Sequence, residues 1–142
     1  MTVIFSKKAE IAIKAMLFLA TKEPEACYDA GTISKELQIP KMFAAKIMQE
    51  LVYSGLLNSK KGKSGGFFLG KNGHDIKLEE IVKAIDGLDA FTSCVFGFPQ
   101  CSDEHPCPVH DKWSVIKGDL LNMLSMTISE MKEKTIDKID SL

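Results

Sequence analysis

A stretch rich in lysine and glycine interrupts the helical pattern of the first half of the chain, at residues 56–73 (LLNSKKGKSGGFFLGKNG). Apolar residues that flank a Lys/Gly/Ser centre predict a β-hairpin with a longer loop. The tip holds Lys60, Lys61 and Lys63 within four positions, and the glycines beside them allow close backbone approach. A basic hairpin of this kind suits a contact with DNA phosphates or with a minor groove.

The pattern of apolar residues predicts three helices before this hairpin. We expect a buried helix over 6–20, a short helix over 32–38 that Thr32 caps, and an amphipathic helix over 40–54. Two short helices, an amphipathic helix and a basic hairpin, in this order, define a winged helix-turn-helix. The order of elements therefore favours a DNA-binding protein.

The third helix has two distinct faces on a helical wheel. Apolar residues, Phe43 among them, share one face, and the opposite face carries Met42, Ala45, Lys46 and Gln49. A small, polar or basic outer face of this kind suits a helix that lies in a DNA major groove, and it is also common on ordinary surface helices.

The charge is divided unevenly along the chain, although the net charge is only −1. Residues 1–75 hold eleven Lys and seven acidic residues (+4), whereas residues 76–142 hold seven Lys and twelve acidic residues (−5). A basic half and an acidic half suggest a nucleic-acid face on the first half, with a solvated lysine-rich surface as the alternative. Arginine is absent, so any reading of guanine must use lysine or another side chain.

The second half predicts a helix over 76–87, an aperiodic segment over 88–111 and one long helix over 112–139. A helix of that length spans roughly 40 Å, and a second copy of the chain could cover it. We therefore expect a homodimer that binds a palindromic DNA operator. The expected fold is mainly α with a small β-wing. Its expected divisions are a winged helix-turn-helix domain (1–75), a linking helix with a cysteine-rich loop (76–111) and a long C-terminal dimerisation helix (112–142).

Composition narrows the class of protein further. Hydrophobic residues make up 45% and charged residues 26% of the 142, which excludes wholesale disorder. The longest apolar run, around residues 15–20, is too short to span a bilayer, and no secretory leader opens the chain, so we expect a cytoplasmic protein. We find no nucleophile–base pair and no phosphate loop, so we expect no enzymatic activity.

The aperiodic segment concentrates potential metal ligands. Cys94, Cys101 and Cys107 follow a C-x6-C-x5-C spacing, and His110 comes after two more residues. Closely spaced thiolates repel one another unless a cation lies between them, which favours zinc or an iron–sulfur cluster over three reduced cysteines in a flexible loop. His105 lies within the same segment and is the weaker candidate ligand.

Two of these features together resemble a known family, the winged-helix regulators typified by IscR and NsrR. They are the hairpin at 59–71 (SKKGKSGGFFLGK) and the three-cysteine loop with its C-x-x-H ending. The resemblance implies that a 2Fe–2S cluster is held by Cys94, Cys101, Cys107 and His110. NsrR-like members instead take a carboxylate from the first helix of the partner subunit, which corresponds here to Glu10 and implies a 4Fe–4S cluster.

The resemblance also implies how DNA is contacted. Lys61 takes the position that enters the minor groove, and the groove helix contacts DNA near its start. The residues that we expect to contact DNA are Lys41, Met42, Phe43, Ala45, Lys46, Lys60, Lys61, Lys63 and Ser64. The expected function is a dimeric transcriptional regulator that senses redox state, iron or nitric oxide through its cluster. The alternatives are a zinc-stabilised or cluster-free winged-helix regulator, and a redox or electron-transfer protein.

Overall fold

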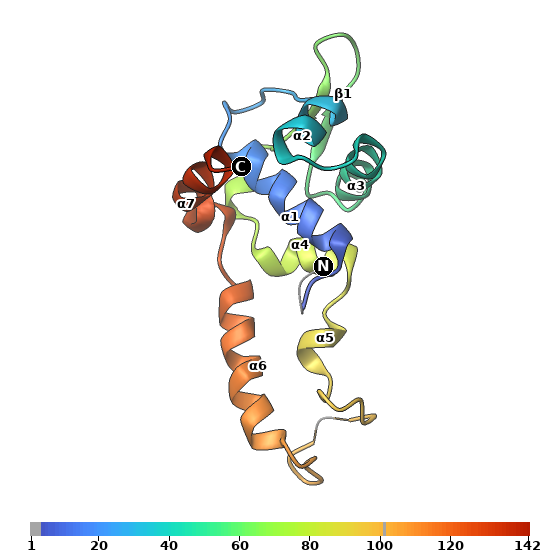
Figure 1. Ribbon diagram of the computed structural model, residues 1–142, viewed down its shortest axis with the longest axis vertical. Helices are drawn as coiled ribbons and strands as arrows, with labels where there is room; N and C mark the ends of the chain where they lie inside the picture. The colour runs from blue at the N-terminus through green and yellow to red at the C-terminus, as the bar shows by residue number, and fades with distance from the viewer. Residues whose placement is uncertain (1–3, 101) are drawn as a thin grey trace.

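The computed structural model describes residues 4–100 and 102–142, which form a head and an arm that projects from it (Figure 1). The head contains α1 to α4, α7 and the two strands, whereas the arm contains α5, α6 and the cysteine loop (residues 93–109). In chain order the elements are α1 (Lys7–Ala20), α2 (Ala30–Leu37), α3 (Lys41–Tyr53), β1 (Asn58–Lys60), β2 (Gly66–Phe68), η1 (Gly73–Asp75), α4 (Leu78–Ile85), α5 (Asp89–Thr92), α6 (His110–Leu124) and α7 (Ile128–Asp140).

The head is organised around α1, which packs against α3, α4 and α7. Ser6 caps α1, because its hydroxyl accepts the backbone N–H of Ala9 at 3.1 Å. Apolar side chains from these helices and from α2 meet in one core, whose largest fully buried side chains are Ile11, Met16, Phe18, Ile33, Ile47, Met48, Leu51, Ile81 and Ile128.

Asp29, and not Thr32 as expected, caps the start of α2, because its carboxylate accepts the backbone N–H of Thr32 at 2.7 Å and the helix begins at Ala30. After α2, a tight turn leads to α3. Gln38 ends α2 in a left-handed conformation (φ 56°), and Pro40 precedes the first turn of α3. This turn sets the angle at which α3 leaves α2, so it fixes the direction of the outer face of α3.

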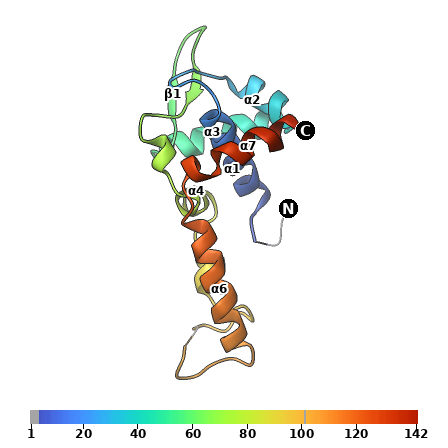
Figure 2. The ribbon, with the colours of Figure 1, turned by 90° about the vertical axis from the view of Figure 1, so that its left-hand side faces the viewer.

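The two strands form an antiparallel hairpin in which Ser59 lies opposite Phe67. We call β1, β2 and the residues between them the wing. Helices α2 and α3 and the wing gather at one end of the molecule, away from the arm (Figures 1 and 2). The mainly α fold with a small β-wing and a helix-turn-helix is therefore confirmed.

The single helix expected over 112–139 is not continuous. Helix α6 ends at Leu124, and Thr127 caps a separate helix, α7, by accepting the N–H of Glu130 at 3.2 Å. Residues between the two helices pair with the segment before α4, through Leu78 N–H to the Met126 carbonyl and Ile128 N–H to the Ile76 carbonyl, each at 2.9 Å. These backbone bonds stop the helix, and α7 folds back onto α1 within the same chain.

The arm joins the head through a second apolar cluster. Leu78 and Val82 of α4 pack with Phe91 of α5 and Leu124 of α6. Beyond this cluster α6 is covered on one side only, and Val115 and Ile116 are 67% and 51% exposed. In the described ranges, 4–100 and 102–142, no helix combines the length and the apolar character needed to cross a membrane.

Candidate nucleic-acid interface and cysteine loop

The outer face of α3 is exposed, as the wheel predicts. Ala44, Ile47, Met48 and Leu51 are buried, whereas Lys41, Met42, Lys46 and Gln49 are exposed and Ala45 is half-buried. Phe43 differs from the expectation for the apolar face, because 51% of it is exposed. It lies at the margin of the apolar arc, in the first turn of the helix, which leaves its ring available at the surface.

The electrostatics of α3 favour a polyanion. Glu50 is its only acidic residue, and its carboxylate forms an ion pair with Lys8 of α1 at 3.0 Å. Neither lysine of the helix, Lys41 or Lys46, has its Nζ within 4 Å of a carboxylate oxygen among the described residues. Lys41 lies close enough to Asp29 to help lower the pKa of that carboxyl, so the positive charge of the outer face of α3 is partly balanced at Lys41 and remains at Lys46.

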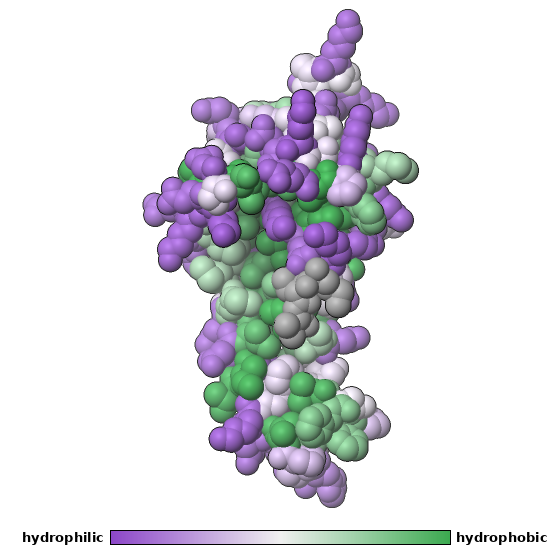
Figure 3. Space-filling model, viewed as in Figure 1, coloured by the Kyte–Doolittle hydropathy of each residue, from purple (hydrophilic) through white to green (hydrophobic). Residues whose placement is uncertain are grey.

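The wing presents its lysines on an exposed tip. Lys60, Lys61, Lys63 and Ser64 are all exposed, and Gly62 turns the chain with a positive φ of 105°. A Cβ atom on Gly65 would lie 2.0 Å from the Lys60 carbonyl oxygen, so the two strands approach more closely than a side chain allows. The space-filling view shows long hydrophilic side chains projecting over this end of the molecule (Figure 3).

The base of the wing is tied to the α1–α2 connection, which the sequence pattern does not predict. Tyr28 and Phe67 exchange two backbone hydrogen bonds, at 3.0 and 2.8 Å. Gly66 makes this possible, because a Cβ atom there would lie 2.6 Å from the carbonyl carbon and oxygen of Tyr28. The wing is thereby fixed relative to the helices that it accompanies.

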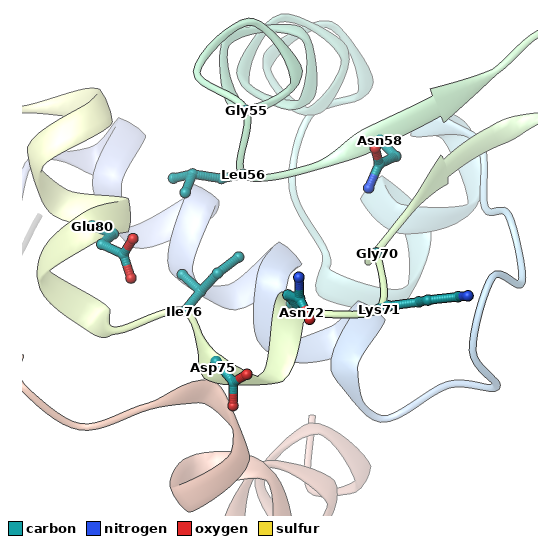
Figure 4. A pocket seen from close by; sticks show the side chains of 10 residues that line it. Gly55, Leu56, Asn58, Gly70, Lys71, Asn72, Asp75, Ile76 and Glu80 are labelled. Atoms are coloured by element: carbon teal, nitrogen blue, oxygen red, sulfur yellow. The ribbon is translucent and has the colours of Figure 1, made fainter.

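A cavity of about 440 Å³ lies below the wing, where the end of α3, η1 and α4 meet (Figure 4). Its charged lining residues are Lys71, Asp75 and Glu80. Glu80 is already engaged, because its carboxylate accepts the Lys77 backbone N–H at 2.7 Å. The cavity therefore offers no arrangement of acid, base and nucleophile.

The cysteine loop brings two of the expected ligands together. Cys94 is buried directly after α5, Cys107 is half-buried, and the two thiols interact. Burial raises the pKa of Cys94, but hydrogen bonds from the backbone N–H groups of residues 96–98 and from the Cys107 thiol outweigh it and lower the pKa. This pocket favours a thiolate, which is the form that binds metals.

The other expected ligands are placed differently. Cys101 lies outside the described residues. His110 is buried at the start of α6, and its Nε2 lies 2.6 Å from Oδ1 of Asp103, an acid that its sequence spacing does not single out. His105 is exposed and lines a cavity of about 400 Å³ with Phe98 and Cys107. Across residues 4–100 and 102–142, no three His, Cys, Asp or Glu side chains gather closely enough to hold a metal ion.

Glu10 lies in the head, whereas the cysteine loop lies at the far end of the arm (Figure 1). Its side chain is only 12% exposed and pairs with Lys7 at 3.8 Å. Within one chain Glu10 therefore does not belong to the cysteine loop, and only the expected contribution from a partner subunit could bring it to a cluster.

The cysteine loop is connected to its surroundings through α5. The indole N–H of Trp113 on α6 donates to the Ser93 carbonyl at 2.9 Å, next to Cys94. Within α5, the ring centroid of Phe91 lies 6.1 Å from that of Phe5, which precedes α1. These contacts join the loop to both α6 and the head.

The helix-turn-helix, the exposed groove helix and the basic wing define the class of DNA-binding transcriptional regulators of the winged-helix type. Comparison with known proteins places the chain more narrowly. Residues 5–134 match the Rrf2 family, described as "Iron-dependent Transcriptional regulator", and the chain belongs to this family. The resemblance stated from the sequence is thereby confirmed, and the chain is a transcriptional regulator and not an enzyme.

Individual relatives agree with this assignment. An HTH-type transcriptional regulator of Aquifex aeolicus is 31% identical over 126 residues (87% of each chain), and IscR of Pectobacterium atrosepticum is 27% identical over 127 residues (89% of this chain, 77% of the relative). Among solved structures, CymR, the global cysteine regulator of B. subtilis, has a TM-score of 0.78 at 22% identity (94% and 98% covered). The structure of T. potens IscR has a TM-score of 0.71 at 21% sequence identity, over 94% of this chain and 88% of that one. Both structures support the fold.

Proposed function

We propose that this regulator binds palindromic operator DNA as a homodimer and that an iron–sulfur cluster on the cysteine loop sets its affinity for DNA. The observation that carries the proposal is the contact between the buried Cys94 thiol and the half-buried Cys107 thiol, beside backbone N–H groups that favour the thiolate form of Cys94. Neighbouring hydrogen-bond donors favour the thiolate form of cysteine, and thiolates are the ligands that hold iron–sulfur clusters.

In the proposed complex α3 enters the major groove and the wing contacts the neighbouring backbone and minor groove. Lys41, Met42, Phe43, Ala45 and Lys46 form the α3 contacts. Lys60, Lys61, Lys63 and Ser64 form the wing contacts, with Lys61 nearest the minor groove. The exposure of these side chains and the neutralisation of Glu50 by Lys8 support this arrangement.

The dimer in this proposal forms through α6. Its 15 residues span roughly 22 Å, and Ile116 and Met123 lie within about 20° of each other on one exposed face. Since α7 is covered by α1, α6 replaces the longer helix over 112–142 as the pairing element. Ile116→Glu should give a monomer by analytical ultracentrifugation. Asn122→Glu, an exposed change about 120° around the same helix from Ile116, should leave a dimer, and a dimeric Ile116→Glu variant would contradict this interface.

The residues proposed to hold the cluster are Cys94, Cys101, Cys107 and His110, with Glu10 of the partner subunit as the alternative fourth ligand. When bound, an iron–sulfur cluster supplies a centre whose charge and ligation change with oxidation, iron loss or nitric oxide. The chain itself buries Cys94, partly buries Cys107, directs the N–H groups of residues 96–98 at Cys94, and restrains His110 through Asp103. The backbone N–H of His110 donates to the Cys107 carbonyl at 3.0 Å, whereas Glu10 lies in the head, so we favour His110 as the fourth ligand and, by the family resemblance, a 2Fe–2S cluster.

The experiment combines metal analysis with DNA binding on protein purified without oxygen. We expect about two iron and two sulfide per chain and a visible spectrum that is lost when Cys94, Cys101 and Cys107 are replaced by Ala. Cys27→Ala, outside the loop, serves as the matched control and should keep the spectrum. Iron near four per chain that Glu10→Ala removes would favour the partner's carboxylate over His110.

Two outcomes would overturn the cluster while leaving the regulator. A colourless protein that holds zinc would indicate a zinc-stabilised winged helix. A protein that binds DNA equally well with and without the three cysteines, and takes up no metal, would indicate a cluster-free regulator. The family assignment sets aside the electron-transfer alternative.

A further inference from the structure

The first turn of α3 exposes two large apolar side chains, Met42 at 86% and Phe43 at 51%. Neither belongs to the apolar core clusters of the described chain. The rest of the apolar face of α3 is buried in the head, so these two residues are not needed to attach the helix. Their exposure therefore calls for a partner outside this chain.

The surrounding charge identifies that partner as DNA and not an apolar protein groove. Lys41 precedes the pair and Lys46 follows it on the same helix, both exposed, and the wing adds Lys60, Lys61 and Lys63 at the same end of the molecule. An apolar protein groove would leave this cluster of cations without counter-charges. The major groove of DNA provides phosphates for the lysines on either side of a base edge.

The chemistry of the face then selects the bases. The chain has no arginine, so the commonest two-point contact with guanine is absent. The one apolar group on a base edge in the major groove is the C5-methyl of thymine, and apolar side chains contact it. The first turn of a recognition helix is also the part that reaches base edges. Almost two turns after Met42, exposed Gln49 has the amide that pairs with the N6 and N7 atoms of adenine.

From this geometry we infer that α3 reads A·T pairs in each operator half-site, with Met42 and Phe43 against thymine methyl groups and Gln49 on adenine. This inference deepens the proposed function and rests on its DNA-binding part. It assigns specificity to the apolar first turn of α3, while the lysines of α3 and the wing supply affinity that does not depend on sequence.

The test removes single methyl groups from the DNA. An operator is first selected from random duplexes, and each thymine of a half-site is then replaced by deoxyuridine, which keeps the pairing and loses the methyl. Fluorescence anisotropy at fixed salt should show a loss of affinity of about fourfold at one or two thymines, as expected for burial of one methyl group. The Met42→Ala and Met42→Gln variants should bind the thymine and deoxyuridine duplexes equally well at one of these positions.

Control variants separate this effect from general weakening. Lys46→Ala should lower affinity and the salt dependence while keeping the preference for thymine. Tyr53→Ala, which changes a 96% exposed side chain at the opposite end of α3, should also keep that preference. Since Met42 is so exposed, its variants should fold normally, which circular dichroism checks.

The outcomes distinguish this inference from the proposed function. If no duplex can be selected, both the DNA-binding proposal and this inference are wrong. If a duplex is selected but its affinity is unchanged by deoxyuridine at every position, or if Met42→Gln keeps the full preference for thymine at every position, only the inference is overturned.

Discussion

Replacement of Gly66 by alanine tests whether the bridge to Tyr28 holds the wing in place. Gly66 has a φ of 141°, which side chains other than glycine rarely adopt, and a new Cβ would lie 2.6 Å from two backbone atoms of Tyr28. The strand must move away, and the two hydrogen bonds between Tyr28 and Phe67, at 2.8 and 3.0 Å, are then lost.

The magnitude follows from these contacts. Two backbone hydrogen bonds contribute about 1 kcal/mol each, and the backbone strain costs about another 1 kcal/mol. We therefore expect Gly66→Ala to lower the free energy of unfolding by about 3 kcal/mol, which a domain of this size can survive. Denaturant titration followed by circular dichroism measures this change.

A matched control is available at the wing tip. Gly62 also has a positive φ, 105°, but a Cβ atom there would meet nothing within 4 Å. Gly62→Ala should therefore cost only the strain, about 1 kcal/mol. The Gly66 variant should also bind DNA more weakly, because its wing lysines are no longer fixed relative to α3. If both variants lose stability equally, the bridge does not hold the wing and this reasoning is wrong.

Three further changes test other contacts. Ser6→Ala should destabilise the chain by about 1–2 kcal/mol in denaturant, since it removes the α1 cap and a hydrogen bond to Asp86, and a change of a few tenths would contradict this. The pKa of Asp29 is lowered mainly by the hydrogen bond from the Thr32 backbone N–H. The contribution of this carboxylate to folding stability is therefore complete above the usual carboxyl pKa and is lost as the pH falls through the lowered pKa. The difference in Tm between wild type and Asp29→Ala should therefore shrink on acidification, and a constant difference would refute it. Trp113→Phe removes the hydrogen bond to the Ser93 carbonyl beside Cys94, so it should hasten loss of the visible cluster spectrum in air. An unchanged lifetime of that spectrum would show that this hydrogen bond does not protect the cluster.

The head was largely predictable from the sequence because its signals are local. The alternation of buried and exposed positions on α3 and the Lys/Gly/Ser tip of the wing each occupy a short stretch of chain. The bridge from the wing to Tyr28 was not predictable, because it joins segments about forty residues apart through backbone atoms, which carry no sequence signal.

The break between α6 and α7 shows where periodicity misleads. An apolar stripe at helical spacing, Leu120, Leu124, Ile128 and Met131, runs across the break at residues 125–127, so the pattern alone favours one helix. The break is set by tertiary contacts, since Ile76 and Leu78 supply backbone partners that a continuous helix would not accept. The stripe persists because α6 and α7 use it against different partners, and Ile128 belongs to the core of the head.

The cysteine loop shows the complementary limit. Its spacing indicates which residue types gather, but the N–H groups directed at Cys94 and the contact between Asp103 and His110 depend on loop conformation. Aperiodic segments carry little information about conformation, so the candidate ligands could be predicted while the groups that restrain them could not.

The path from the cysteine loop to the DNA-binding surface is short in the proposed mechanism. Cys94 follows α5, whose Phe91 ring lies beside Phe5, and Ser6 next to it caps α1 and bonds to Asp86 just before α5. A hundredfold change in DNA affinity requires about 2.8 kcal/mol. That free energy equals the net contribution of about three hydrogen bonds. A shift of α5 that disturbs only the contacts around Ser6 and Phe91 is therefore large enough. The condition is that the cluster states differ by the same free energy in the position of α5 that they favour. Since α1 also packs against α3, the start of α1 is the point at which a change at Cys94 reaches the groove helix.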